Sequence, residues 1–242
     1  MTRRRWIADE VSGDTAALVG DHAAHLARVL RAEVGQEFDI ATGDEVRRGT
    51  ITTIGYDRVE FALGKKTVLR SPGDAPKISL AMAIFKFDRM EWGLEKCTEI
   101  GVTRIIPVIA RRSDAHLVAA AGKRRERWLR VVRQAAEQSR REAPPEIAPA
   151  VKVKDLAGDM VSAGSVTRIV LAESEADARL GDVLPSWATE VALAIGPEGG
   201  WSDGELAWFY EAEWTAASLG GTILRAETAA IVGAALVIDG LR

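Results

Sequence analysis

Short, continuous apolar runs recur through the second part of the chain, and each run ends at a turn before a stretch with helical spacing. The runs cover residues 77–84, 104–109, 168–172 and 191–195. A strand that is buried on both faces of a sheet is apolar throughout rather than alternating. Because these runs alternate with helical stretches, the pattern predicts an α/β domain with a mostly parallel sheet.

The first part of the chain carries shorter β-like runs, at 37–41, 49–54 and 58–63, separated by turn signals. This pattern predicts a small β-barrel. Two prolines and a glycine within residues 71–76 discourage regular structure and indicate a linker. We therefore expect a barrel domain over 1–70, a linker over 71–76 and a second domain over 77–242.

Helical spacing marks a short helix at 22–31, a long helix at 123–141, and two helices near the end of the chain, at 203–214 and 226–241. The helix at 203–214 can begin with a capping box of Ser202 and Glu205. The last is almost wholly apolar, so we expect it to be buried. The long helix places five arginines away from its apolar face, namely Arg127, Arg130, Arg133, Arg140 and Arg141.

Two glycine-rich turns each lie between an apolar run and a helical stretch. The first spans 195–205 and the second 219–230. Such turns leave main-chain amides and carbonyls free to contact a ligand, and together they suggest one bipartite pocket. Structural turns are the alternative, since glycine and proline occur in most loops. Neither turn has the Gly-Lys-Ser/Thr ending of a phosphate loop or the glycine pattern of a dinucleotide site, so neither ATP hydrolysis nor dinucleotide binding is indicated.

Length and composition bound the class of protein. The chain has 242 residues, 47% of them hydrophobic, which is enough for one large or two ordinary domains. No apolar run is long enough to span a membrane, and the basic start lacks the apolar segment of a secretion signal. A single cysteine, Cys97, and three histidines argue against a disulfide or a metal site. We expect a cytoplasmic protein without metal.

Charge is segregated along the chain, although the net charge is only −3. Residues 104–141 hold eleven Lys or Arg and three acidic residues, whereas residues 155–213 hold two basic and twelve acidic residues. A basic block can supply the phosphate contacts that dominate nucleic-acid affinity. A solvated helix face is the alternative.

Charged side chains also follow the second glycine turn, inside an otherwise apolar stretch. If Arg225 and Glu227 are partly buried, each needs a partner or a ligand. An internal ion pair of Arg225 with Glu227, or with Glu198, is the structural alternative to a ligand.

The two turns, GPEGGWSDGE and LGGTILRAETAA, resemble the cofactor-binding signature of the SPOUT methyltransferases, and specifically of the family that methylates N3 of a uridine in small-subunit ribosomal RNA. Three further segments match that family in the same order along the chain. Residues 22–31 with Gly35 resemble its N-terminal RNA-binding module. Residues 86–91 with 95–102 resemble its first catalytic-domain helix, and residues 134–140 with 144–145 resemble a later helix and its exit.

The resemblance implies an α/β domain with a C-terminal trefoil knot, preceded by a small PUA-like β-barrel. It also implies S-adenosyl-L-methionine as the cofactor. Arg225, Glu227 and Glu198 are the candidates for the base, or for the cation that stabilises the uracil anion. The cofactor residues implied are Leu171, Ile195, Gly196, Pro197, Glu198, Gly199, Gly200, Leu219, Gly220, Ile223, Leu224, Arg225 and Thr228.

The partner implied is 16S ribosomal RNA in the small ribosomal subunit, and a homodimer is expected from the superfamily. The expected RNA contacts are His25, Arg28, Arg31, Lys86, Arg112, Arg127, Arg130, Arg133 and Arg140. Two alternatives stay open. One is a methyltransferase of the same superfamily with another target, such as a ribose 2′-hydroxyl in transfer RNA. The other is an RNA-binding or ribosome-assembly protein without catalysis.

Overall fold

The computed structural model describes residues 4–43, 45–67, 76–159, 166–175 and 177–241. It divides the chain into two units. Unit 1 contains Met1–Gly73 and Arg133–Pro144, and unit 2 contains Asp74–Val132 and Pro145–Arg242. Except for Pro76, the predicted linker lies outside the described residues. Unit 1 therefore takes a segment of the domain predicted at 77–242, and the functional division of the chain stays a prediction.

Unit 1 is built on a six-stranded sheet with the order β1-β4-β5-β6-β3-β2. All of its pairings are antiparallel except β1 with β4. A short helical segment follows β3 and contains one α-turn, α1, and one π-turn, η1. The elements are β1 (Trp6–Ile7), β2 (Glu10–Ser12), β3 (Thr15–Val19), α1 (Asp21–Ala24), η1 (His25–Val29), β4 (Glu37–Ala41), β5 (Val46–Ile54) and β6 (Arg58–Thr67).

One short segment links the two ends of this sheet. Strand β1 pairs with β4, and β2 pairs with β3 at the other end of the strand order. Between them, the amide of Ala8 donates to the carbonyl of Ala41, and the amide of Asp9 donates to the carbonyl of Ala17. Apolar side chains from all round the sheet, including Trp6, Leu18, Ile40 and Phe61, form the core of the unit.

The end of helix α3 (Ala115–Gln138) contributes to unit 1 through its last residues. Ala136 packs with Ile7, Ala41 and Val46 in a small apolar cluster. Glu137 is fully buried, accepts a hydrogen bond from the amide of Ile7 at 3.3 Å, and pairs with Arg4. A buried carboxylate requires such partners.

Unit 2 contains a parallel sheet with the order β10-β8-β7-β12-β11-β13, and β9 also pairs with β8. Its helices alternate with the strands, as the apolar runs predicted. The elements are β7 (Lys77–Ala83), α2 (Phe87–Ile100), β8 (Arg104–Ile109), α3, β9 (Glu146–Ile147), β10 (Val151–Lys152), α4 (Val153–Asp159), β11 (Thr167–Leu171), α5 (Leu180–Val183), β12 (Glu190–Ile195), α6 (Asp203–Glu211), β13 (Thr215–Ala217) and α7 (Ala226–Gly240).

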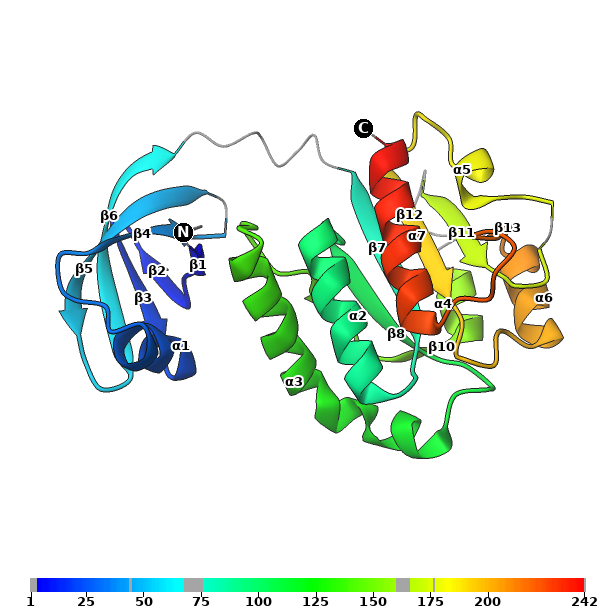
Figure 1. Ribbon diagram of the computed structural model, residues 1–242, viewed down its shortest axis with the longest axis horizontal. Coiled ribbons are helices and arrows are strands. Elements are labelled where there is room, and N and C mark those ends of the chain that lie inside the picture. Colours follow the sequence, from blue (N-terminus) through cyan, green and yellow to red (C-terminus); the bar gives the residue numbers. More distant parts are fainter. Residues whose placement is uncertain (1–3, 44, 68–75, 160–165, 176, 242) are drawn as a thin grey trace. The chain divides into compact units, whose positions relative to one another are not determined.

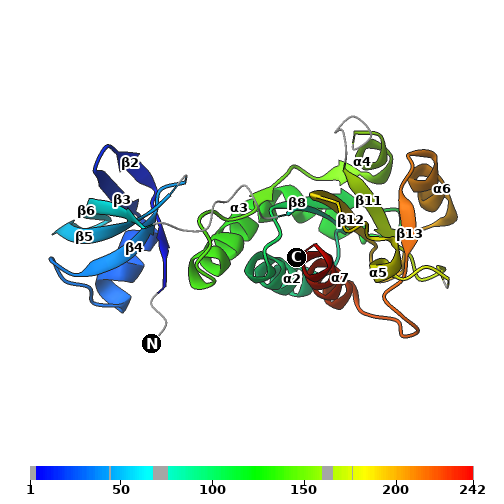
Figure 2. The ribbon, with the colours of Figure 1, turned by 90° about the horizontal axis from the view of Figure 1, so that it is seen from above.

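Helices cover both faces of this sheet. Figure 2 shows α2 and α7 on one face and α4 and α6 on the other. The first face encloses a large apolar core to which α2, α3 and α7 contribute Leu94, Trp128 and Val237. The second encloses a smaller core that includes Leu156 and Phe209. The four predicted strands thus lie in the middle of a three-layer unit (Figure 1).

Several predicted boundaries are wrong. The long helix runs over Ala115–Gln138 rather than 123–141, so Arg140 and Arg141 lie beyond its end. Helix α6 ends at Glu211, three residues before the predicted end. Helix α7 is buried along one face only, since Leu236 is 44% exposed. Strands β1, β2 and β3 were not predicted from the sequence. Strands β1 and β2 have two and three residues, too few to establish a period, and the five residues of β3 do not alternate, since Ala16, Ala17 and Leu18 are all buried.

Candidate active site

A cavity of about 610 Å³ opens in unit 2 where β11, β12 and β13 end. Loops at the carboxyl ends of parallel strands form the ligand sites of open α/β sheets. Its lining comes from both glycine turns, from the segment after β11 and from α2. The lining residues are Arg89, Leu171, Ala172, Glu173, Glu175, Arg179, Ile195, Gly196, Pro197, Glu198, Gly200, Trp201, Ala217, Ser218, Leu219, Gly220, Gly221, Thr222, Ile223, Leu224, Arg225, Ala226 and Ala229.

The first glycine turn is tightly packed against Trp201. A Cβ atom added to Gly196 would lie 3.3 Å from the indole ring and 3.4 Å from the Trp201 amide nitrogen, so a larger residue has little room there. The indole Nε1 donates to the carbonyl of Leu171 at 3.1 Å, which joins the end of β11 to this turn. Gly200 has a φ of +68° and donates to the carbonyl of Pro197 at 2.8 Å, a conformation that favours glycine.

The second glycine turn offers an unpaired main chain. The main-chain amides and carbonyls of residues 219–224 form no hydrogen bond with any other main-chain group in the described part of the protein. All six residues line the cavity, and Gly220 has a φ of +123°. Leu219, Gly220 and Leu224 are half-buried, whereas residues 221–223 are exposed. Main-chain groups with no protein partner beside a cavity are suited to hold a ligand with hydrogen-bonding edges.

Eleven of the thirteen predicted cofactor residues line this one cavity, although they come from three separate segments of the chain. The other two, Gly199 and Thr228, are not among the lining residues. Gly199 instead packs against the side chain of Arg112. Four charged lining residues were not predicted from the sequence, namely Arg89, Glu173, Glu175 and Arg179. The position of Glu173 directly after the β11 run was a usable signal, whereas Arg89 lies on a distant helix.

The three predicted catalytic residues separate into two groups. Arg225 and Glu198 are exposed and line the cavity. Glu227 is 5% exposed and is not a lining residue. Its Cβ lies 3.7 Å from the position of a Cβ built on Gly93, which places it between α7 and α2. Among the described residues, no ion pair joins Arg225 to Glu198 or to Glu227, so the internal pairs considered from the sequence do not form.

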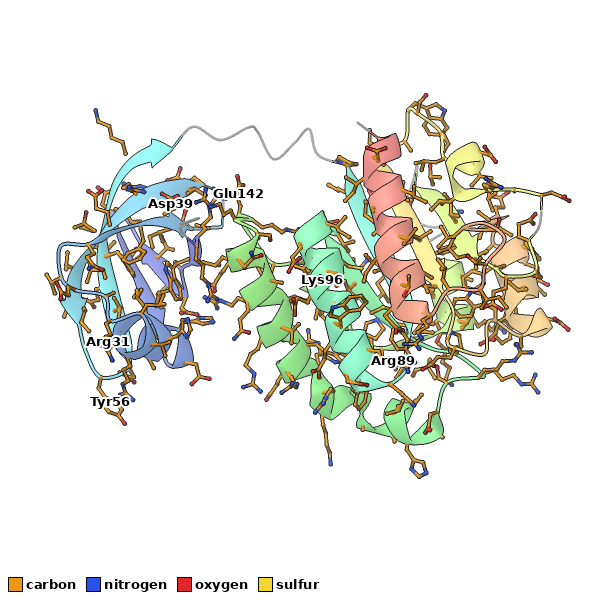
Figure 3. The ribbon with its side chains drawn as sticks, viewed as in Figure 1. Arg31, Asp39, Tyr56, Arg89, Lys96 and Glu142 are labelled. Atoms are coloured by element: carbon orange, nitrogen blue, oxygen red, sulfur yellow. The ribbon has the colours of Figure 1, made fainter. Side chains whose placement is uncertain are left out.

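Arg89 connects Glu227 to the cavity. Its Nε lies 3.9 Å from Oε1 of Glu227, while the residue itself lines the cavity wall. Figure 3 shows Arg89 at the end of α2 that lies beside the start of α7. The other carboxylate oxygen of Glu227, Oε2, is buried and has no hydrogen-bond partner in the part of the chain described. Glu227 thus lies behind Arg89, which lines the cavity, and does not line it itself.

A buried carboxylate fixes the helix that follows the first turn. Glu205 accepts hydrogen bonds from the amide of Ser202 at 2.9 Å and from its hydroxyl at 2.8 Å. This bears out the predicted pairing of Ser202 and Glu205 at the start of α6. The other carboxylate oxygen of Glu205 accepts a hydrogen bond from the amide of Arg111 at 2.7 Å, which joins the segment after β8 to the start of α6.

Some predicted RNA contacts of unit 2 already have ion pairs or hydrogen bonds within the unit. Lys86 and Arg130 are exposed. Arg127 is paired with Glu91, at 2.8 Å from Oε2, and Arg124 pairs with the same carboxylate. Arg112 donates two hydrogen bonds to main-chain carbonyls of the first glycine turn. Two of the four cations are thus already engaged within the unit.

In unit 1, Arg133, a predicted RNA contact, is half-buried and already has partners within the protein. Its Nη1 lies 2.7 Å from Oδ1 of Asp9, and its Nη2 donates to the carbonyl of Ile7 at 2.6 Å. Arg28 stacks on the ring of Tyr56, and Figure 3 places Tyr56 and Arg31 at the same end of the unit. His25 is half-buried, with its ring against Trp6. Arg140 has a φ of +61°, and its carbonyl accepts from Arg5.

The described residues contain neither a metal-binding cluster nor a membrane-spanning helix. No group of three or more His, Cys, Asp or Glu side chains is arranged to hold a metal ion there. No helix among these residues is both long enough and apolar enough to cross a bilayer. Cys97 is buried, and burial raises the pKa of its thiol to about 12.

Comparison with known proteins identifies the family. Residues 73–238 match the family model described as an RNA methyltransferase domain. The chain is 31% identical to ribosomal RNA small subunit methyltransferase E of Rickettsia conorii, over 91% of this chain and 88% of the relative. It is 32% identical to the enzyme of the same name from Mycobacterium bovis, over 91% and 85%.

A solved structure agrees with these sequence matches. Ribosomal RNA small subunit methyltransferase E from Neisseria gonorrhoeae, bound to S-adenosyl methionine, superposes with a TM-score of 0.84 at 29% identity. The superposition covers 96% of this chain and 95% of that one. The mixed α/β fold, with its parallel sheet in unit 2, is therefore that of these methyltransferases. The chain belongs to the RNA methyltransferase family that contains ribosomal RNA small subunit methyltransferase E.

Proposed function

We propose that this protein transfers a methyl group from S-adenosyl-L-methionine to N3 of a uridine in 16S ribosomal RNA. The observation that carries the proposal is the cavity of about 610 Å³, where two glycine turns and three arginines, Arg89, Arg179 and Arg225, meet at the ends of parallel strands. Family membership supports the reaction class. The choice of N3 and of 16S RNA rests on the resemblance of the motifs.

The cavity fits the proposed cofactor in size and chemistry. Its volume is within the range of small-molecule sites. The free main-chain groups of residues 219–224 can pair with the edge of an adenine, and the apolar side chains of Leu171, Ile195 and Leu224 can cover its faces. When bound there, S-adenosylmethionine supplies an activated methyl group on a positively charged sulfur.

The protein must also handle the proton on N3 of uracil. The reaction replaces the N3–H bond with an N3–CH₃ bond, so the proton must leave to a base or to water. Glu198 is the carboxylate among the predicted bases that lines the cavity, and we assign it this role. The guanidinium groups of Arg89 and Arg225 can stabilise the negative charge that develops on the uracil ring.

The cations proposed to bind RNA are those that have no ion pair among the described residues. Arg31, Lys86 and Arg130 are exposed, and each can reach a phosphate. The Arg28–Tyr56 pair offers a stacking surface for an unpaired base, a common feature of single-stranded RNA recognition. The target uridine must be unpaired or flipped, since N3 is otherwise occupied by base pairing.

The finer features of the fold also belong to the proposal. We infer a C-terminal trefoil knot formed by the loops around the cavity, and a PUA-like barrel in unit 1, closed through residues 6–12. A homodimer is supported by exposed apolar side chains on neighbouring helices, Trp92 on α2 and Leu236 on α7, which are 48% and 44% exposed. Action on the small subunit would place the protein in the cytoplasm.

Mass-spectrometric mapping of 16S ribosomal RNA from cells that lack this protein tests the proposal. We expect the loss of one 3-methyluridine, and its restoration by the wild-type gene. Loss of a ribose 2′-O-methyl group from transfer RNA would instead support the other methyltransferase. An unchanged set of RNA methyl groups, with no binding of S-adenosylmethionine to the purified protein, would indicate an assembly protein without catalysis.

A further inference from the structure

An exposed arginine lies against the outside of the first glycine turn. Arg112 follows β8, and its Nη1 donates to the carbonyl of Gly199 at 2.6 Å and to the carbonyl of Trp201 at 3.2 Å. Its aliphatic part packs where the side chain of residue 199 would begin. A Cβ built on Gly199 would lie 3.3 Å from Cδ of Arg112.

Each of these two hydrogen bonds fixes the carbonyl of a peptide unit whose amide is also hydrogen-bonded. A peptide unit is planar, so fixing its carbonyl also fixes its amide. The unit between Gly199 and Gly200 has its carbonyl bonded to Arg112 and its amide bonded to the carbonyl of Pro197. The unit between Trp201 and Ser202 has its carbonyl bonded to Arg112 and its amide bonded to Glu205.

The segment that carries Arg112 is itself fixed to the same place. The amide of Arg111 donates to Glu205, the carboxylate that also holds Ser202. Three elements therefore converge on this turn: the loop after β8, the turn after β12 and the start of α6. Gly200 and Trp201, which lie between the two held peptide units, both line the cavity.

We propose that Arg112 is a positioning residue for the cofactor, holding the first glycine turn in its binding conformation, and not an RNA contact. This inference rests on the proposed function. Pre-organisation of a binding turn raises affinity because the free protein does not have to order it on binding. Arg112 would thus act on the cofactor through Gly200 and Trp201, without touching it.

The adjacent residue provides a matched control. Arg111 has the same charge, is also exposed, and its side chain makes no hydrogen bond or ion pair within the described ranges. Arg111→Ala and Arg112→Ala therefore change the overall electrostatics equally. Only the second removes the donors to the turn. Arg112→Met keeps the aliphatic packing against Gly199 and removes the same donors.

Calorimetric titration of S-adenosylmethionine into wild type, Arg111→Ala, Arg112→Ala and Arg112→Met tests the proposal. We expect both Arg112 variants to bind about tenfold more weakly, as befits two charge-assisted hydrogen bonds on an exposed side chain, and Arg111→Ala to bind like wild type. In methylation assays the Arg112 variants should raise the KM for the cofactor and leave kcat nearly unchanged.

Affinity for S-adenosylmethionine that is equal in Arg112→Met and Arg111→Ala would overturn the role of Arg112. Should Arg112→Ala fail to fold, judged by its thermal unfolding, Arg112→Met decides. Absence of binding by the wild-type protein would count against the proposed function itself, so the two failures can be told apart.

Discussion

The indole of Trp201 donates a hydrogen bond to the main-chain carbonyl of Leu171, 3.1 Å away, and both residues line the cavity. Trp201→Phe keeps the ring and removes the donor, which leaves a buried carbonyl without this partner. We expect a loss of about 1–2 kcal/mol in the free energy of unfolding, measured with denaturant. The affinity for S-adenosylmethionine should also fall. A fully stable variant with normal affinity would show that this bond does not hold the turn.

Gly196 is the glycine of the first turn where a side chain meets the most resistance. Gly196→Val would push β-carbon and methyl groups into the Trp201 ring and main chain, so we expect cofactor binding to be lost in a protein that still folds. Gly204→Ala is the control, because a Cβ there meets nothing within 4 Å. That helix position should gain up to about 1 kcal/mol from the alanine. Calorimetry and thermal unfolding measure both effects.

The rate of methyl transfer distinguishes the proposed roles of Glu198 and Glu227. Glu198→Gln should slow single-turnover methylation at saturating cofactor and RNA by about 10²-fold or more, the effect of losing a proton-transfer group. Glu227→Gln should act mainly through Arg89 and so reduce the rate less. Quenched-flow measurements of the methylation rate from about pH 6 to about pH 9 compare the two variants, because the rate of a reaction that uses a general base depends on pH. A larger loss in Glu227→Gln would reverse the assignment.

Arg130 is the predicted RNA contact on α3 that has no ion pair among the described residues. It is exposed, whereas Arg127 and Arg133 are paired with carboxylates. Arg130→Ala should weaken RNA binding and flatten the log–log dependence of affinity on salt by up to about one unit. Cofactor affinity should stay unchanged. A salt slope equal to that of wild type would mean that this face of α3 is simply solvated.

Asp9 gives unit 1 a predictable response to acid. Burial raises its pKa, but hydrogen bonds from His22 and the Val19 amide, together with the charge of Arg133, outweigh burial and hold the pKa below its ordinary value. A carboxylate with a depressed pKa stabilises the fold above about pH 4, and that contribution is lost as the pH falls through the folded-state pKa. Asp9→Asn should therefore unfold more easily at pH 7, by about 1–2 kcal/mol, and show a weaker acid dependence below about pH 4. Chemical denaturation at a series of pH values measures this, and parallel curves for the two proteins would contradict it.

The apolar runs predicted the central strands of unit 2 because a strand that is buried on both faces is apolar along its whole length. The glycine turns were predictable for a related reason, since a positive φ such as that of Gly200 restricts the residue type. Short strands such as β1 carry no such signal. Their position depends on pairing with β4, about thirty residues further along the chain.

Side-chain partners could not be predicted from helical spacing. Arg133 was expected to contact RNA because it lies off the apolar face of its helix, and nothing in that spacing indicated its ion pair with Asp9, which is remote in sequence. Glu227 follows Arg225 by two residues, and a helix turns about 100° per residue. Ala226 and Ala229 therefore take the cavity side of α7, while Glu227 turns toward α2. Proximity in sequence to a glycine turn did not ensure a place in the cavity wall.

The assignment of Arg133–Pro144 to unit 1 limits how this protein can be taken apart or recombined. A gene fragment that ends at Gly73 would encode every strand of the small sheet but not Arg133, Ala136 or Glu137. In it, Asp9 would lose its ion pair with Arg133, and Ile7 would lose its hydrogen bonds with Arg133 and Glu137. We do not expect that fragment to behave as a transplantable module. The same interleaving constrains evolution, since the sheet of unit 1 could not be exchanged for another without changing the end of a helix that begins in unit 2.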